Sequence, residues 1–324
     1  MAIKPQRIGP FPLGMDNRVP DYSTSLPEGG DLLRDALNVD VTVRGAVKTR
    51  QGFSVAVSGT DVHSLWSPPE GDFALYCDAG NLYRTTPAMA PVLVAPGFGQ
   101  MGPVRYAQVN EAIYFTDGVR AGSYHPSAGP TPAWGSAAAQ TVGDQDLVPM
   151  PPGSNLAYHN ARLLVAVGNA LIYSEPFTPH LRDAARGFEL FPAPITCVAA
   201  VEAGVFVVAD KTYFIAGGFP AQTVHAVLPY GGPSQQAGYR PDGGAHWMST
   251  RGIVACSKDG EITNLQDKHI AIEVSGAAAT LMREADGTRA IRAAGSRAQI
   301  VTMSNNASGG FIRQMGEHAH GTIV

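Results

Sequence analysis

The chain has 324 residues, of which 44% are hydrophobic and only 15% charged, with 37 glycines, 25 prolines and a formal net charge of −4 at pH 7. Many turn-forming residues and few charges are typical of a folded domain built from short strands, and they argue against intrinsic disorder. The sequence contains neither an apolar run of about 18 residues nor an apolar leader after Met1, so we expect no membrane-spanning segment and first folding in a cytoplasm.

The charges are unevenly distributed along the chain. Residues 54–282 contain eleven Lys or Arg against eighteen Asp or Glu, whereas residues 283–313 contain five arginines against two acids. A surface that grips nucleic acid presents clustered Lys and Arg. The acidic central region therefore argues against specific nucleic-acid binding.

The first 50 residues divide into an arm and a hairpin. Residues 1–30 are interrupted by Pro and Gly and cannot build a core of their own, and their scattered apolar residues favour an extended arm laid on a neighbouring surface. Residues 37–50 alternate apolar and polar positions about Arg44-Gly45, which predicts a half-buried β-hairpin. Propellers often close by pairing strands from the two termini, and this hairpin is our candidate for that pairing.

A hairpin pattern then recurs and sets the architecture. Two apolar runs flank a turn rich in Asp, Asn and Gly, which tolerate the positive φ of tight turns. The clear copies have turns 39 to 51 residues apart, a period typical of four-stranded propeller blades. The copies are residues 73–84, 112–118, 163–173, 205–214, 253–262 and, more weakly, 280–291.

We therefore predict an all-β fold, a propeller-like ring of five or six antiparallel blades. The expected domains are an extended N-terminal arm (1–30), the propeller-like domain (31–295) and a C-terminal strand or tail (296–324). Two stretches break the repeat, the irregular residues 126–154 and the glycine-rich residues 229–244. Long loops on a regular scaffold are often functional, so we expect these two loops and the arm to form interfaces. Residues 181–186 read as a short helix.

The three cysteines read as free structural thiols. Cys77 and Cys256 each precede a hairpin turn, and Thr116 takes that place in another copy. A small, half-buried strand position explains all three residues, while an odd number of cysteines cannot fully pair. A redox or metal role is the alternative.

Several short patterns resemble parts of known sites, and none is complete. They are Gly45-Ala-Val-Lys48-Thr49, Gly231-Gly-Pro-Ser234, Ser257-Lys-Asp259-Gly, Asp144-Gln-Asp146 and Glu317-His318-Ala-His320. Respectively, they fall short of a phosphate loop, a nucleophile elbow, a sialidase turn, a calcium cage and a metal site. We predict no enzyme, and no catalytic, cofactor-binding or metal residues.

The N-terminal region resembles a known family. The pieces Gly14-Met-Asp-Asn-Arg18, Leu26-Pro-Glu-Gly29 and Ala36-Leu-Asn38-Val-Asp40 lead into Arg50-Gln-Gly52-Phe53. This resembles the start of tail nozzle, hub or tail-tip β-propeller proteins of tailed bacteriophages, in which an Arg-x-Gly-Phe/Tyr step precedes a ring of hairpins. The similarity covers about residues 14–53 and, more loosely, the repeats to about residue 275.

The resemblance implies a structural virion protein of the phage tail, assembled in the cytoplasm of a bacterial host. It implies self-association into a ring, with contacts to adjacent tail or head–tail connector proteins. Genome DNA would pass through the lumen without specific binding, since an acidic wall repels phosphates.

Two other functions fit a propeller. A carbohydrate- or receptor-binding adhesin or lectin needs exposed aromatic residues, but Trp66 and Trp247 lie in strand-like contexts that predict core positions, and only Trp134 lies in a loop. A glycan-cleaving enzyme needs acids that converge from different blades, which one sequence does not reveal.

Overall fold

The computed structural model describes most of the chain between residues 57 and 315, together with short N-terminal pieces. The described residues are 16, 18, 25–26, 30–31, 39–41, 47–49, 57–68, 72–127, 129–131, 139–142, 144–267, 278–285, 288–295, 300–306 and 309–315. Every regular element in these ranges is a β-strand. In the described ranges there is accordingly no helix long and apolar enough to cross a membrane.

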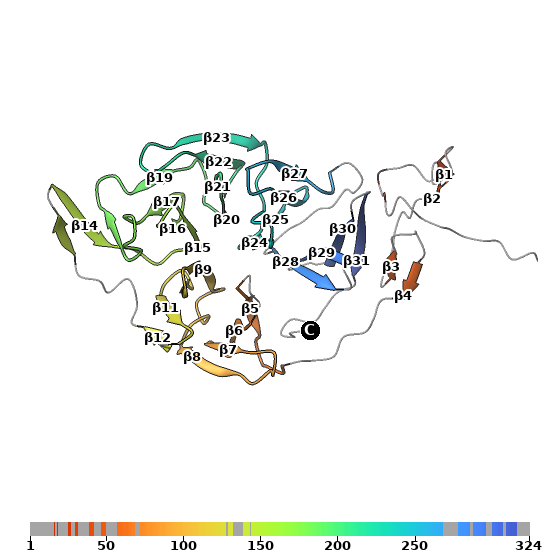
Figure 1. Cartoon of the computed structure of the whole chain (residues 1–324), viewed down its shortest axis with the longest axis horizontal. Helices are drawn as coiled ribbons and strands as arrows, with labels where there is room; N and C mark the ends of the chain where they lie inside the picture. Colours follow the sequence, from red (N-terminus) through yellow and green to blue (C-terminus); the bar gives the residue numbers. More distant parts are fainter. Residues whose placement is uncertain are drawn as a thin grey trace, which may run out of the picture.

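Six four-stranded antiparallel sheets follow one another around a ring (Figure 1). The first sheet contains β5 (His63–Trp66), β6 (Ala74–Asp78), β7 (Asn81–Thr85) and β8 (Val92–Pro96). The second contains β9 (Arg105–Val109), β10 (Ala112–Thr116), β11 (Ala121–His125) and β12 (Gly129–Thr131). The third contains β15 (Asn155–His159), β16 (Arg162–Val167), β17 (Ala170–Tyr173) and β19 (Phe188–Leu190).

The remaining three sheets continue around the ring. The fourth contains β20 (Cys197–Val201), β21 (Gly204–Val208), β22 (Thr212–Ala216) and β23 (Thr223–Leu228). The fifth contains β24 (Gly238–Tyr239), β25 (Ala245–Ser249), β26 (Gly252–Cys256) and β27 (Ile262–Asn264). The sixth contains β28 (Ala278–Ala285), β29 (Thr288–Gly295), β30 (Ile300–Asn306) and β31 (Gly309–Met315).

Each predicted hairpin is a pair of adjacent strands, so the repeat was read correctly as an all-β propeller-like ring. In the first hairpin Asp78 pairs with Asn81 around Gly80, whose φ is +74°, the left-handed region in which glycine is unstrained. The fifth hairpin is one strand out of phase: it joins the third and fourth strands of its sheet, because the two-residue β24 precedes β25. Cys77 and Cys256 each precede a hairpin turn, but on the second strand of one sheet and the third strand of the other, so the predicted equivalence of their positions is wrong.

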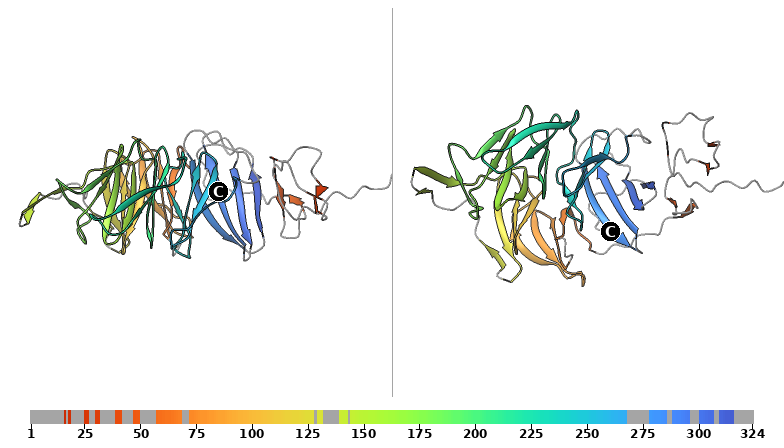
Figure 2. Two further views of the ribbon diagram at one scale, coloured as in Figure 1. Left: turned by 90° about the horizontal axis from the view of Figure 1, so that it is seen from above. Right: turned by 45° about the horizontal axis from the view of Figure 1, so that its top comes forward.

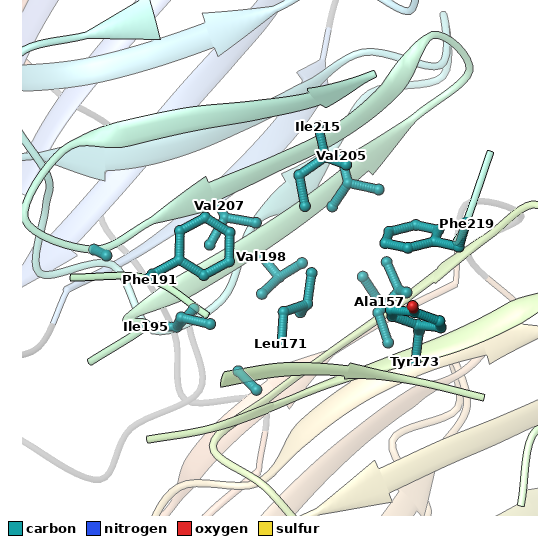
Figure 3. Packing of buried hydrophobic residues seen from close by; sticks show 13 residues of the cluster. Ala157, Leu171, Tyr173, Phe191, Ile195, Val198, Val205, Val207, Ile215 and Phe219 are labelled. Carbon is teal, nitrogen blue, oxygen red and sulfur yellow. The ribbon is translucent and has the colours of Figure 1, made fainter. Parts of the chain in front are cut away.

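The core consists of apolar layers between neighbouring sheets. Figure 3 shows the layer between the third and fourth sheets, where Leu171 and Phe191 face Val198, Val205 and Ile215. Similar layers separate the first from the second, the second from the third and the fourth from the fifth sheet. Each fully buried Leu, Ile or Phe contributes about 1.5–3 kcal/mol. The fold is therefore held together by contacts between successive blades.

The N-terminal hairpin forms as predicted, but it does not complete a blade. β3 (Val39–Val41) pairs with β4 (Val47–Thr49) in register Val39 to Thr49. The pair remains a separate two-stranded sheet beside β31. The expectation of ring closure by this hairpin is wrong, because the C-terminal strands supply all four positions of the sixth sheet. β30 and β31 fall within the segment expected as a C-terminal strand or tail. A further short pair joins β1 (Ser25–Leu26) to β2 (Gly30–Asp31).

The stretch predicted as irregular, 126–154, contains strands. Besides β12, it holds β13 (Gln140–Val142) and β14 (Gln145–Pro149), and β14 pairs with β18 (Leu181–Asp183). This three-stranded sheet projects from the rim of the ring (Figure 1). The short helix predicted at 181–186 is therefore wrong: Leu181 is 1% exposed, and pairing with Pro149 favours an extended backbone there.

Candidate functional site

Two faces of the ring carry its loops, because antiparallel pairing places successive connections at alternate ends of the strands (Figure 2). Face I is formed by loops that join the first to the second and the third to the fourth strands of the first five sheets. Its described parts are 67–68, 72–73, 86–91, 110–111, 126–127, 160–161, 174–187, 202–203, 217–222, 240–244 and 257–261.

Face II is formed by the loops between second and third strands and by the links between sheets. Its described parts are 57–62, 79–80, 97–104, 117–120, 150–154, 168–169, 191–196, 209–211, 229–237, 250–251 and 265–267. Backbone hydrogen bonds between sheets agree with this division. Ala203 N donates to Lys258 O at 3.0 Å on face I, and Thr250 N donates to Gly231 O at 3.1 Å on face II.

Polar residues gather where the innermost strands begin, at the face II end of the ring axis. His63, Arg105, Asn155 and Cys197 are the first residues of β5, β9, β15 and β20, which lie nearest the centre of the ring in Figure 1. The fifth sheet contributes Gln235, which precedes β24. Five sheets thus contribute groups near the axis, four through the first residue of a strand and the fifth through the link before β24.

Arg105 crosses the axis. Its Nη2 donates to Oε1 of Gln235 and its Nη1 to Val104 O at 3.1 Å, while Nε has no partner among the described residues. The side chain is 7% exposed, and none of the ion pairs between described residues involves it. Burial lowers its pKa to about 10, so the guanidinium is charged at neutral pH. It acts as a tie between the second and fifth sheets.

The groups beside Arg105 are poorly suited to acid–base or nucleophilic chemistry. Burial lowers the pKa of the His63 imidazole, whose Nδ1 lies 2.7 Å from Ser64 Oγ. Burial raises the pKa of the Cys197 thiol to about 12, so the reactive thiolate is scarce at neutral pH. The axial cluster is therefore a set of neutral polar groups around one buried cation.

Side-chain hydrogen bonds connect each sheet to the next. Each one satisfies a backbone or side-chain group at a sheet boundary, and losing such a buried partner costs about 1–3 kcal/mol. In ring order the bonds are Val104 N to Ser64 Oγ (2.8 Å), Gly153 N to Thr116 Oγ1 (3.3 Å), Asn155 Nδ2 to Thr196 O (2.7 Å), Thr196 Oγ1 to Gly232 O (2.8 Å) and His246 Nδ1 to Thr280 Oγ1 (2.9 Å).

A second notable group lies on face I, in the long loop of the third sheet. Phe177 is 84% exposed and has φ +60°, a conformation that is rare for a bulky residue. Its N–H donates to Ala161 O at 2.8 Å. Arg162, 8% exposed, donates to Ser174 O and lies 3.6 Å from the Glu175 carboxylate. The loop that presents Phe177 is thus fixed by a buried guanidinium.

No known protein-family model matches the chain. No curated protein matches its sequence. Among solved structures, the "Mitotic Checkpoint Complex" has a chain that superposes with a TM-score of 0.52 at 9% identity, over 82% of this chain and 82% of that one. This level of structural similarity at such low identity bears on the fold alone. The chain is a β-propeller.

Two weaker similarities were also found. The Cps50 (Swd1) β-propeller domain of Myceliophteria thermophila has a TM-score of 0.46 at 9% identity, over 78% of this chain and 98% of that one. A gluconolactonase of Xanthomonas campestris has a TM-score of 0.46 at 10% identity, over 74% and 84% of the two chains.

The buried carboxylates of the propeller serve its turns. Asp117 Oδ1 accepts from the N–H groups of Val119 and Arg120, and Asp183 Oδ1 accepts from Ala185 N. Within the described ranges, no group of three or more His, Cys, Asp or Glu could hold a metal ion. Asp117 and Asp183 thus each have one oxygen engaged in a turn, while the buried Oδ2 of Asp117 has no hydrogen-bond partner among the described residues.

The sequence-predicted candidates take structural places or lie outside the described residues. Asp146 lies in the β13–β14 hairpin and accepts from Thr141 Oγ1 at 3.1 Å. Asp259 lies in a hairpin turn closed by Ser257 N and Glu261 O at 2.8 Å. Ser234 is fully buried, and its Oγ donates to Gln236 O at 3.0 Å. Of Gly45 to Thr49, the described residues Val47–Thr49 form β4. Trp134 and Glu317 to His320 lie outside the described ranges. All three cysteines are free and buried, as predicted.

The tryptophans that the structure describes pack inside the propeller. Trp247 is fully buried, with its ring centroid 5.4 Å from that of Phe206, and Trp66 stacks on Tyr106 at 5.6 Å. Neither offers the exposed platform of a carbohydrate site, as their strand contexts predicted. Among the described aromatic residues Phe177 is the most exposed, at 84%, and sequence reasoning missed it. In the first four sheets the loop after the third strand contains a proline, at positions 87, 126, 176 and 220. The loop that carries Phe177 is one of these four.

Proposed function

We propose that this propeller is a structural subunit of a bacteriophage tail, which works by binding copies of itself and neighbouring tail proteins. The observation that carries the proposal is the contrast between axis and rim. At the described axial end the buried Arg105 binds Gln235, whereas large apolar side chains are exposed on loops and outer strands. Such a distribution favours a scaffold that makes contacts over one that holds a substrate at its centre.

The outer strands supply part of the contact surface. On β8, Val92 and Leu93 are 60% and 52% exposed, and on β19 Phe188 and Leu190 are 41% and 59% exposed. Exposed apolar residues gathered on unpaired edge strands favour association. The assignment to a phage tail rests on the resemblance over residues 14–53.

A genome conduit in such an assembly would lie between copies. A buried guanidinium at the axis attracts phosphate, whereas an unhindered passage for DNA needs a wall that repels it. We therefore place the lumen at the centre of a ring of propellers, and the axis of each propeller serves its stability.

Electron microscopy and mass photometry of the full-length protein test the self-association. We expect ring-shaped particles containing several copies. Peptides of this chain in gradient-purified phage particles test the virion assignment. A protein that stays monomeric at high concentration and binds a defined glycan on an array, or hydrolyses a polysaccharide, would overturn the proposal.

A further inference from the structure

The two faces of the propeller differ in charge. On the described loops of face I, six carboxylates are exposed and only two cations, Arg186 and Lys258. The exposed carboxylates belong to Asp72, Glu111, Glu202, Asp242, Asp259 and Glu261. On the described loops of face II the balance reverses, with exposed Arg120, Lys211 and Arg251 against exposed Asp61 and Asp210.

This polarity favours one kind of self-contact. Two copies that meet through face I bring carboxylates together, and like charges facing each other across an interface are costly. Contact of face I with face II brings carboxylates towards Arg120, Lys211 and Arg251. The charges therefore select a head-to-tail contact, in which two different surfaces meet and successive copies form a ring or a filament.

Face I also carries a rigid apolar projection. Phe177 is 84% exposed, and its left-handed backbone is of the kind that costs about 1–3 kcal/mol and persists only where surrounding contacts enforce it. Those contacts are the bond to Ala161 O and the Arg162–Glu175 pair. Met89, in the equivalent loop of the first sheet, is 46% exposed and has φ +55°. An exposed aromatic side chain of this type becomes buried when a partner binds, and such anchors contribute most of the binding energy of an interface.

Face II carries apolar side chains on two adjacent loops. Met101 is 66% exposed and Val119 is 58% exposed. The two loops are joined by Arg120, whose Nη1 donates to Gly97 O at 2.8 Å. An apolar pair beside an exposed cation complements an exposed aromatic side chain on a face that carries an excess of carboxylates.

We propose that copies of this chain associate head to tail, with the Phe177 loop of one copy seated on the Met101 and Val119 loops of the next. This inference rests on the self-association in the proposed function and specifies its surfaces. Phe177 supplies the apolar anchor, and the opposite charges of the two faces set the direction of assembly.

Site-directed crosslinking tests the direction. The native cysteines are buried, so cysteines introduced by Phe177→Cys and Val119→Cys report on the interface alone. Under mild oxidation we expect crosslinks when differently tagged single variants are mixed, none when either is alone, and a ladder from the double variant. Val92→Cys, 60% exposed on the outer strand β8 and away from the loops of both faces, is the control: it should not crosslink with Phe177→Cys or Val119→Cys, whereas a crosslink with itself would report only a contact between outer strands.

The outcomes separate this inference from the proposed function. Crosslinking of Phe177→Cys with itself would indicate contact between like faces and overturn the head-to-tail arrangement. An oligomeric wild type with no crosslink in the mixture would overturn the proposed surfaces and leave self-association intact. A wild type that is monomeric at all concentrations would overturn both.

Affinity measurements test the two contributions independently of crosslinking. Phe177→Ser should weaken association at least about tenfold, the effect expected of an aromatic anchor, with an unchanged melting temperature because the side chain is exposed. Glu111→Lys combined with Glu202→Lys should also weaken it and reduce its dependence on salt. Wild-type affinity in both variants would refute the inference.

Discussion

His246 provides a test of the fold that combines burial with pH. It lies on β25 with no exposed surface, and its ring is clamped so closely that a Cβ on Gly238 would lie 2.1 Å from Cε1. The Thr280 hydroxyl donates to His246 O at 3.1 Å and therefore accepts from Nδ1–H at 2.9 Å. Nε2 then carries a lone pair with no partner among the described residues, and protonating it would bury an unpaired charge.

The pH dependence follows from the two states of this ring. Burial, with a smaller effect of Arg240, lowers the pKa of His246 from 6.5 to about 3. Below pH 6.5 the unfolded chain takes up a proton there that the folded chain does not, so the free energy of unfolding falls as the pH falls. At about 1.36 kcal/mol per pKa unit, His246 should remove about 2 kcal/mol of stability between pH 7 and pH 5.

Urea unfolding at about pH 7 and about pH 5, followed by the fluorescence of buried Trp247, measures this loss. His246→Asn keeps a donor near Thr280 Oγ1 but cannot titrate. Between these two pH values the variant should therefore lose about 2 kcal/mol less unfolding free energy than the wild type. The half-buried His63 and the buried His159, whose pKa values are also lowered by burial, remain in both proteins, so their contributions cancel. An equal pH dependence in wild type and variant would refute the reasoning.

Three further predictions concern packing and buried charge. Burial raises the pKa of the Cys77 and Cys197 thiols to about 12 and that of Cys256 to about 11, so all three should resist a thiol reagent at pH 8 until denaturant is added. Rapid labelling of the native protein would contradict their burial. Gly231→Ala should lower stability by about 1–3 kcal/mol in thermal unfolding, since its Cβ would lie 1.9 Å from Ala209 O. Arg162→Met should cost about 2–3 kcal/mol by leaving Glu175 without its partner, whereas Lys258→Met, at an exposed ion pair, should cost less than about 1 kcal/mol.

Local patterns predicted the blades well because a hairpin is specified by neighbouring residues. Asp78 to Asn81 form a tight turn whatever the rest of the chain does, and the apolar runs beside it can only bury themselves against another sheet. The phase of the fifth sheet was missed because β24 has only two residues and carries no pattern of its own. Residues 181–186 were misread because β18 depends on pairing with β14, more than thirty positions away.

The residues of the candidate site could not be predicted, because they depend on contacts between distant parts of the chain. Arg105 and Gln235 are 130 positions apart, and neither belongs to a motif. Nothing in the sequence around Phe177 indicates that this phenylalanine has a left-handed backbone conformation. That conformation follows from Arg162, which is recognisable as a buried residue only once the third sheet is formed.

The exposed carboxylates of face I could serve one of two mutually exclusive roles, at an interface between copies or in a channel wall. The excess of Asp and Glu over residues 54–282 suggested a lumen that repels DNA, and in the propeller six exposed carboxylates gather on face I. If face I meets face II of the next copy, those carboxylates are covered by cations and cannot line a channel. The effect of reversing charges on face I therefore decides between the uses. Weaker association assigns the carboxylates to the interface, whereas unchanged association with slower DNA release from assembled particles would assign them to the lumen.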